Sequence, residues 1–299
     1  MSDALQVAIP VPAVRVTSRT RATTMGRIWR RWRNPIGIVG AAVILLTVLV
    51  AVAAPAITPF EPSSQAHKRL LPPGPPYLMG TDELGRDTFS RIVFGARVSL
   101  QVGALAVTIA LVLGTSLGLL GGFYGGRLDD VLMRVVDIMF AFPGLVLAIV
   151  IAGLLGPSRN NAMLAIGFVY APAFARVVRG SVIAVMAEPY MESARVSGAS
   201  DWRAIRLHVL PNVLAPLIVM VSVYLSQAIL SEAALSFLGL GTQPPEPSWG
   251  GMLSAARSYM ELSPWMAIFP GAAIMLIVLG FNFLGDGLRD VLDPRLRSL

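Results

Sequence analysis

The chain has 299 residues, of which 55% are hydrophobic and only 14% are charged, and its formal net charge is +7. The mean hydropathy of +0.69 is far above that of a water-exposed globular protein, so the composition indicates an integral membrane protein. The chain contains no cysteine, which excludes disulfide bonds and thiolate metal sites.

Apolar runs without any Asp, Glu, Lys or Arg predict the membrane-spanning helices, because a span needs about 20 predominantly apolar residues. A sixth, shorter run at residues 162–175 reaches that length only if Arg176 and Arg179 extend their charged ends to the membrane surface; otherwise it is a buried or interfacial helix. We expect six spans and an all-α integral membrane fold. The five longer runs are residues 37–57, 98–123, 138–155, 213–231 and 262–285.

The first predicted span, residues 37–57, follows a basic tail formed by residues 1–36. Trp29 and Trp32 lie among the arginines of this tail, as expected of an anchor at the lipid headgroups. The span ends in small residues, as a signal peptide does, but its apolar core exceeds the roughly 7–15 residues of that class. We therefore expect a helix that stays in the protein.

Two loops, residues 58–97 and 232–261, are predicted on the outer side of the membrane. Each contains a proline-rich stretch, LPPGPPY or TQPPEPSWGG, which disfavours a regular helix. Glu232 is predicted to lie at the outer end of the preceding span, where the membrane meets water. The first loop also carries an acidic group that either forms a structural turn with two arginines or contacts a delivery protein. These side chains are Asp82, Glu83, Asp87, Arg86 and Arg91.

The basic residues predict the orientation, because short loops rich in Lys and Arg stay in the cytoplasm. With six spans both termini lie on one side, and the segments on that side contain most of the 24 Lys and Arg residues. Both termini are therefore expected in the cytoplasm, whereas five spans would place them on opposite sides. The basic segments are the tail 1–36, the turn around Arg127 and Arg134, the stretch from Arg176 to Arg206 and the C-terminal tail 286–299.

A polar stretch, EPYMESARVSGASDWRAIRLHVLPN, occupies residues 188–212 between two apolar runs on the predicted cytoplasmic side. A short helix can run up to Gly198, where glycine permits a left-handed turn. A second helix can begin at Ser200 or Asp201, whose side chains can cap free amides, and Pro211 either ends it or starts the next span. The pattern predicts two short amphipathic helices joined at a glycine.

Trp202, Ile205 and Val209 are spaced so that they form one apolar stripe on the second of these helices. Such a helix either lies on the lipid headgroups as a connector or enters a groove on a soluble partner, with Trp202 as an anchor. The local pattern alone leaves both interpretations open.

This polar stretch resembles the EAA loop of the membrane subunits of binding-protein-dependent ABC importers. The resemblance rests on Glu192, Ala194, Gly198, Leu210 and Pro211. Ser193 stands where the motif has its middle alanine, and His208 occupies a position that is usually hydrophobic.

Three further stretches resemble the dipeptide, oligopeptide and nickel branch of these importers, and the first of them is similar to the second permease subunit of such systems. They are MGTDELGRDTFSRIVFGARVSL at residues 79–100, GGFYGGRLDDVLMRVVDIMFAFPGLVLAI at residues 121–149 and SEAALSFLGLGTQPPEPSWGGML at residues 231–253. Together with the loop they cover much of the chain between residues 79 and 294.

The resemblance implies a permease subunit in a bacterial inner membrane that pairs with a homologous permease, two cytoplasmic ABC ATPases and an extracytoplasmic substrate-binding protein. Glu192 would then pair across the ATPase interface, Gly198 would set the bend, and Trp202 and Ile205 would belong to the apolar surface that fills the ATPase groove. The implied substrates are dipeptides or short oligopeptides, with nickel or another small peptide-like solute as the alternative.

No motif for ATP hydrolysis is present, since the single lysine, Lys68, is not part of a G-x-x-x-x-G-K-[ST] loop. We expect a subunit without enzymatic activity, without its own cofactor and without nucleic acid, whose partner chains bind ATP and Mg²⁺. The stretch GTSLG at residues 114–118 matches a nucleophile pattern, but it lies in an apolar span, where Gly118 and Gly122 favour helix packing instead. His67 and His208 are predicted on opposite faces and so cannot share a metal ion.

Two other classes of function compete with the permease. An ion-coupled secondary transporter would favour ionisable groups at mid-membrane and internal repeats, whereas the charges here avoid the centres of the spans. An intramembrane enzyme would need a nucleophile and a base near each other, which the sequence does not offer. Substrate-binding residues stay unassigned.

Overall fold

The computed structural model describes residues 35–292, and within this range the regular elements are helices, without named strands. The long helices are α2 (Pro35–Val52), α4 (Thr88–Tyr124), α7 (Arg159–Met186), α10 (Leu210–Phe237) and α12 (Trp265–Leu292). The shorter ones are α3 (Ala54–Ile57), α5 (Gly126–Phe140), α6 (Gly144–Leu155), α8 (Pro189–Val196), α9 (Asp201–Ala204), a π-helical turn (Ile205–Val209), α11 (Trp249–Ala256) and a 3-10 turn (Arg257–Tyr259).

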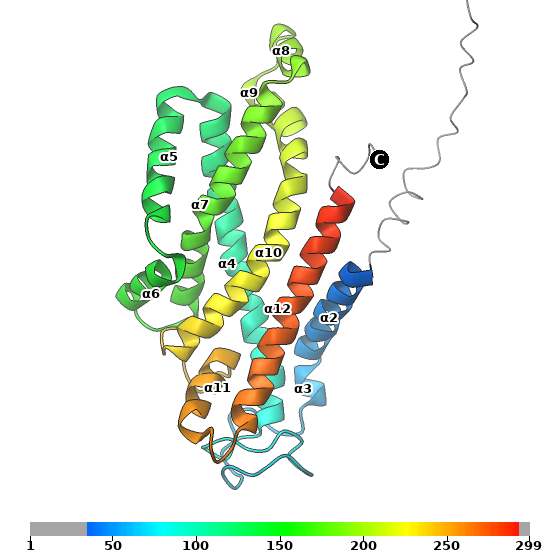
Figure 1. Ribbon diagram of the computed structural model, residues 1–299, viewed down its shortest axis with the longest axis vertical. Coiled ribbons are helices and arrows are strands. Elements are labelled where there is room, and N and C mark those ends of the chain that lie inside the picture. The colour runs from blue at the N-terminus through cyan, green and yellow to red at the C-terminus, as the bar shows by residue number, and fades with distance from the viewer. Residues whose placement is uncertain (1–34, 293–299) are drawn as a thin grey trace, which may run out of the picture.

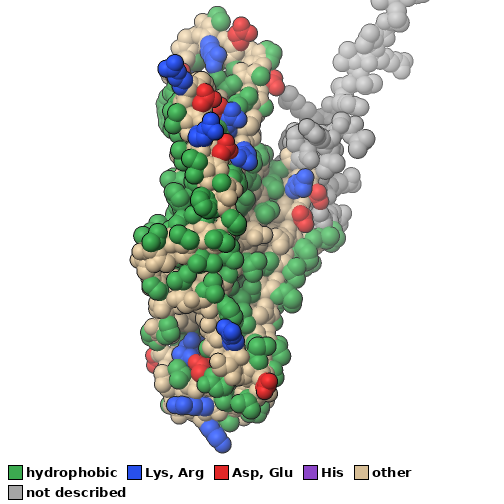
Figure 2. Space-filling model, turned by 60° about the vertical axis from the view of Figure 1, so that its left-hand side comes forward, with side chains coloured by type: hydrophobic (Ala, Val, Ile, Leu, Met, Phe, Trp, Pro, Cys, Tyr) green, Lys and Arg blue, Asp and Glu red, His purple; other side chains and the backbone are tan. Residues whose placement is uncertain are grey.

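The long helices form an elongated bundle with α4, α7, α10 and α12 at its centre and α2 packed against α12 (Figure 1). Helix α8 lies at one end, and α11 lies at the other together with the loop at residues 58–87. Charged side chains gather at these two ends, and a hydrophobic band separates them (Figure 2). Five helices are long and apolar enough to cross a membrane, or six if one bent pair counts as a span. The all-α membrane fold is thus confirmed.

Two of the predicted spans differ in the structure from what their sequences suggested. Residues 162–175, the shortest of the predicted runs, lie in the continuous, 28-residue helix α7. Residues 138–155, which we predicted as one span, contain a break, where α5 and α6 meet at an angle of 91°. The break occurs at Pro143. Proline disfavours a helical conformation in the residue before it and has no N–H to donate to a backbone hydrogen bond, so it ends a helix.

Glycines bring α4 and α7 into close contact. A Cβ atom at Gly118 would lie 2.8 Å from Cβ of Val178, and one at Gly122 would lie 2.9 Å from Cβ of Val182. Such distances require the absence of a side chain, as in small-residue packing between membrane helices. The packing interpretation of the GTSLG stretch is therefore confirmed.

Arg176 and Arg179 bond to α5 and do not simply extend toward the membrane surface. Nε and Nη2 of Arg179 each donate to one carboxylate oxygen of Asp129 at 2.6 Å. Arg176 donates to Asp137 at 2.8 Å, and both of these side chains are more than half exposed. The two ion pairs tie the first half of the bent segment to α7.

We expect Arg179→Gln to lower the free energy of unfolding by about 1.5–3 kcal/mol, because it leaves the Asp129 carboxylate, which is only 13% exposed, without its charged donor. The check is a double-mutant cycle with Asp129→Asn, measured by thermal unfolding of the purified protein in detergent. Arg176→Gln is the matched control, for which about 0–1 kcal/mol is expected because that pair is exposed. Equal effects of the two arginine variants would contradict the assignment.

The two segments that we predicted on the outer side are more ordered than the sequence suggested. Helix α4 begins at Thr88 because the Asp87 carboxylate accepts from Ser90 N and caps it, so the first outer loop ends ten residues earlier than expected. The second outer segment contains helix α11, whose Trp249 is 2% exposed and donates from Nε1 to Ile92 O at 3.0 Å. Prolines precede α11 but do not interrupt it.

Glu232 lies near the C-terminal end of α10, and its side chain is fully buried among other parts of the protein. Its carboxylate accepts from Ser236 Oγ at 2.7 Å and from Ser99 Oγ at 3.3 Å. Trp29, Trp32 and most of the basic tail lie outside the described residues, and so do the last seven residues of the C-terminal tail. The predictions for these residues therefore stay predictions.

Candidate functional site

The predicted polar loop forms a projection at the α8 end of the bundle (Figure 1). We call residues 188–209 the two-helix projection; it consists of α8, the turn at residues 197–200, α9 and the π-helical turn. It is the part of the described chain that reaches furthest beyond the long helices at this end. A position outside the apolar band is suitable for contact with a soluble protein.

Gly198 closes α8 with a defined hydrogen-bonded turn. Its φ angle is +76°, and its N–H donates to Arg195 O at 3.0 Å, while Ala199 N donates to Ala194 O at 3.1 Å. These two bonds are those of a Schellman motif, which satisfies the last carbonyls of a helix. Gly198 therefore occupies the left-handed position that the sequence predicted for it.

The second helix is not the separate short helix that we expected. Residues 201–237, from α9 through the π-helical turn to the end of α10, form a single candidate span of 37 residues. Leu210 N donates to Ile205 O, which closes the π-helical turn, and Pro211 follows in the first turn of α10. The projection is thus continuous with a membrane helix.

The three apolar residues of the predicted stripe do not share one environment. Trp202 is 68% exposed, but Ile205 and Val209 are buried in the protein's own core. Ile205 therefore cannot fill a partner's groove in this conformation, and that part of the expectation is wrong. Met191 of α8 is also buried, so apolar side chains from both helices anchor the projection to the bundle.

The remaining predicted residues lie around this anchor. Glu192 is exposed, and Ser193 donates from its hydroxyl to Pro189 O at 3.2 Å. His208 packs its ring 5.9 Å from that of Tyr190, and Leu210 is half-buried. Ser200 has the backbone of a helix cap, but no side chain caps α9.

The outward surface of the projection is mixed in charge and contains exposed apolar side chains. Trp202 and Val196 are its most exposed large hydrophobic residues, at 68% and 85%. Acidic and basic residues surround them: Glu188, Glu192, Asp201, Arg195, Arg203 and Arg206. An aromatic anchor within a charged rim is typical of the centre of a protein–protein interface.

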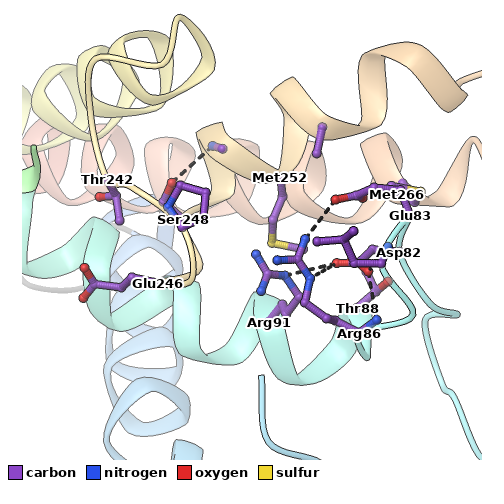
Figure 3. A pocket seen from close by; sticks show the side chains of 14 residues that line it. Asp82, Glu83, Arg86, Thr88, Arg91, Thr242, Glu246, Ser248, Met252 and Met266 are labelled. Carbon is purple, nitrogen blue, oxygen red and sulfur yellow. Dashed lines mark hydrogen bonds and ion pairs between the residues drawn. The ribbon is translucent and has the colours of Figure 1, made fainter. Parts of the chain in front are cut away.

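The acidic group at the opposite end is a structural turn (Figure 3). Asp82 accepts from Arg86 Nε at 2.6 Å and from the backbone N–H groups of Leu84 and Arg86, and Arg91 Nε lies 3.5 Å from it. Asp82 and Asp87 are at most 5% exposed, so they do not offer a surface to a delivery protein. The turn and α11 enclose a cavity of about 160 Å³.

A second cavity, which the sequence did not indicate, lies beside the break between α5 and α6. Its volume is about 390 Å³, and α7 and α10 complete its wall with Tyr170, Tyr224 and Gln227. Gln227 is the only amide side chain in the apolar run 213–231, which is the one local signal that could have drawn attention to it. Its neighbours could not be found without the tertiary structure.

The described residues contain no group of three or more His, Asp or Glu side chains that could hold a metal ion. The fold of the described residues is that of a polytopic helical membrane protein with a charged two-helix projection at one end. Residues 87–298 match the family described as the binding-protein-dependent transport system inner membrane component. Residues 23–73 match the N-terminal transmembrane domain of oligopeptide transport permease C.

The chain is similar over most of its length to curated permeases. It is 48% identical to the dipeptide transport system permease protein DppC of Alkalihalophilus pseudofirmus over 89% of this chain and 88% of the relative. It is 42% identical to the glutathione transport system permease protein GsiD of Pectobacterium atrosepticum over 96% of both chains. An inward-facing structure of the MetNI methionine ABC transporter shares the fold, with a TM-score of 0.54, 20% identity and coverage of 67% of this chain and 96% of that one.

The chain belongs to the family of inner membrane permease components of binding-protein-dependent ABC transport systems. It is accordingly a multi-pass inner membrane protein and a transport permease subunit.

Proposed function

We propose that the protein is one of two permease halves of an ATP-driven importer of dipeptides or short oligopeptides. The second half is a homologous permease, two cytoplasmic ATPases bind ATP and Mg²⁺, and an extracytoplasmic binding protein delivers the substrate. Peptides are favoured over nickel because relatives at 48% and 43% identity are named dipeptide permeases. ATP hydrolysis is assigned to the partner chains, since the one lysine of this chain lies outside a phosphate-binding loop.

The observation that carries this proposal is the continuity of the two-helix projection with α10. Because residues 201–237 form one helical unit, a displacement of the projection by an ATPase is transmitted to the membrane segment. The buried side chains of Met191 and Val209 keep the projection fixed to the bundle. A loosely tethered loop would absorb such a movement instead.

In this proposal the α8 end faces the cytoplasm, and both termini lie on the same side. The α8 end carries Arg195, Arg203 and Arg206 within the short span-flanking segments where basic residues determine orientation. The start of α2 and the end of α12, the two ends of the described chain, are the ends of these helices that point toward the α8 side of the bundle (Figure 1). The contact residues for the ATPase are Glu192, Ser193 and Trp202 on the surface, with Ala194, Gly198, Ile205, His208, Leu210 and Pro211 supporting their positions.

The test is reconstitution of the complete complex in vesicles with a radiolabelled dipeptide and the cognate binding protein. ATP-dependent uptake, together with recovery of the ATPases on this tagged subunit, is the expected result. Uptake by this chain alone without ATP would instead establish a secondary transporter and contradict the proposal.

We expect Gly198→Val to reduce uptake about 5- to 30-fold, because a non-glycine residue in the left-handed conformation is strained by about 1–2 kcal/mol. The reason is the backbone angle and not lack of room, since a Cβ atom at Gly198 would have nothing within 4 Å.

Gly198→Asn is the matched control, because asparagine enters the left-handed region more readily, and it should retain most of the uptake. Uptake by vesicles with equal amounts of inserted protein is the measurement. If the valine and asparagine variants transport equally well, the turn does not determine coupling.

A further inference from the structure

We infer that the cavity beside the break between α5 and α6 is a water-filled part of the transport path, in which Gln227 binds the amide group of the transported peptide. This inference rests on the proposed function and names residues of the substrate path that neither the sequence nor the family assigns. We call it the break cavity; it is lined by Met139, Phe140, Phe142, Gly144, Val169, Tyr170, Pro172, Ala173, Val223, Tyr224 and Gln227.

The first argument is the position of the cavity along the spans. Tyr170 is 11 residues from the first residue of α7, or about 16 Å along the axis at 1.5 Å per residue. Gln227 is ten residues from the last residue of α10, or about 15 Å. Both residues are therefore near the middle of a hydrocarbon layer that is about 30 Å thick.

The second argument is the non-helical backbone at this depth. Helix α5 ends at Phe140 and α6 starts at Gly144, and the two helices are bent by 91°. Inside a bilayer, non-helical backbone is tolerated only where it is buried in protein or lines a water-filled cavity. Phe142, at the break, is 53% exposed in this subunit, so the break is not buried in the described chain.

The third argument is the unused hydrogen-bonding capacity of the wall. Tyr170 Oη lies 2.7 Å from Ser231 Oγ and donates to Gln227 O at 3.2 Å, so its orientation is fixed. Within residues 35–292, neither the Gln227 side-chain amide nor the Tyr224 hydroxyl has a hydrogen-bond partner. An amide left exposed to lipid is costly, whereas water or a polar solute satisfies it.

The chemistry of the wall indicates the kind of solute. The Gln227 amide offers one acceptor and two donor hydrogens, which match the N–H and C=O of a peptide bond. The rings of Tyr170 and Tyr224 lie 5.0 Å apart at 69° and form an apolar, aromatic surface beside it. The lining within the described chain contains no charged side chain. These groups fit the uncharged middle of a peptide and tolerate different side chains, while they do not select its charged termini.

The main competing occupant is a helix of the partner permease, which would also cover this face. A volume of about 390 Å³ is within the range of about 300–1,000 Å³ that is typical of small-molecule sites. A packed helix would leave no such space, and it would need its own polar side chain at mid-membrane for the Gln227 amide. The two occupants make opposite predictions for access by water.

The chain contains no cysteine, so single cysteines can be placed in it without altering other positions. In the assembled importer we expect Gln227→Cys and Tyr224→Cys to react with a water-soluble, membrane-impermeant thiol reagent. Leu46→Cys, at a position that is 63% exposed in the middle of the peripheral helix α2, is the lipid-facing control and should not react. If the Gln227→Cys variant does not react and its thiol cross-links to the partner permease, the inference is overturned.

The second readout identifies the solute. During transport, dialanine is present at about ten times its dissociation constant for the cavity of this variant. It should then slow the labelling of the Gln227→Cys variant about tenfold, because the cavity is occupied most of the time. Labelling that proceeds equally fast with and without dialanine would overturn the peptide assignment. A failure of the proposed function is recognised separately, because the unmodified complex would then transport no dialanine at all.

The third readout measures the amide directly. Gln227→Leu keeps a similar volume but removes the polar group, and we expect about a 3- to 10-fold loss of dialanine uptake at a limiting concentration, the effect of one neutral hydrogen bond. Gln101→Leu makes the same change at an exposed position of α4 outside the cavity wall and should leave uptake unchanged. Equal uptake by both variants would contradict a role for Gln227.

Discussion

Replacement of Trp202 by aspartate is expected to abolish stable binding of the ATPase subunits while the permease still folds. Trp202 lies in α9 of the two-helix projection and is 68% exposed, so little of its side chain packs against the rest of the described chain. A tryptophan anchor at the centre of an interface contributes about 2–4 kcal/mol, which corresponds to a loss of affinity of about 30- to 1,000-fold. A carboxylate in an apolar groove adds an unpaired charge to that loss.

The measurement is recovery of ATPase on the tagged permease after solubilisation in detergent, with the amount of folded permease checked by size-exclusion chromatography. Leu262→Asp is the control, since Leu262 is 72% exposed at the opposite end and undergoes a comparable change from apolar to acidic. We expect it to retain the ATPase. Undiminished recovery with Trp202→Asp would remove Trp202 as the anchor and favour the headgroup-connector interpretation.

Replacement of Gly118 by leucine is expected to prevent formation of the bundle. The glycine lies where α4 and α7 are in contact, and even a Cβ atom would come within 2.9 Å of Arg179 N. Overpacking of a rigid interface costs about 1–3 kcal/mol and occasionally more, and leucine adds four carbon atoms to a site without room for one. The two helices must then separate, and the Arg179–Asp129 pair loses its geometry with them.

Gly180→Leu provides the matched control. Gly180 is a helical glycine like Gly118, but it lies in α7, and a Cβ atom there would have nothing within 4 Å. We expect this variant to remain folded, with a thermal midpoint near that of the unaltered protein. The measurement is the folded yield after extraction and the midpoint of thermal unfolding in detergent. A normally folded Gly118→Leu variant would show that α4 and α7 do not pack through this face.

Much of the architecture can be predicted from the sequence, because insertion of a helix into a membrane depends on the summed hydropathy of its consecutive residues. Any run of about 20 apolar residues is long enough to span, whatever the rest of the chain does. The runs at residues 98–123, 213–231 and 262–285 accordingly lie inside long helices or begin just before one. Gly198 was also predictable, because only the local backbone decides whether glycine is needed at the end of a helix.

The features that the sequence left open depend on contacts between distant segments. Residues 162–175 are followed by Arg176 and Arg179, whose charges make the apolar run short for a span. In the structure these arginines pair with Asp137 and Asp129 of α5, which the sequence alone does not reveal. Glu232 was placed at the interface because nothing local shows that Ser99, far away in the sequence, donates to it. Hydropathy assigns to a charged residue a free-energy cost of burial, but it contains no information about which distant groups pair with that residue or donate hydrogen bonds to it.

The sequence by itself determined the membrane class, the positions of most spans and the presence of a polar, glycine-bent element between two of them. Only the tertiary structure decided that Ile205 is buried while Trp202 is exposed, that the third apolar run is broken and bent, and that Gln227 lines a cavity. The physical reason is that the free energy of burial in lipid adds up along the chain, whereas the surroundings of a side chain are decided by which other helix packs beside it.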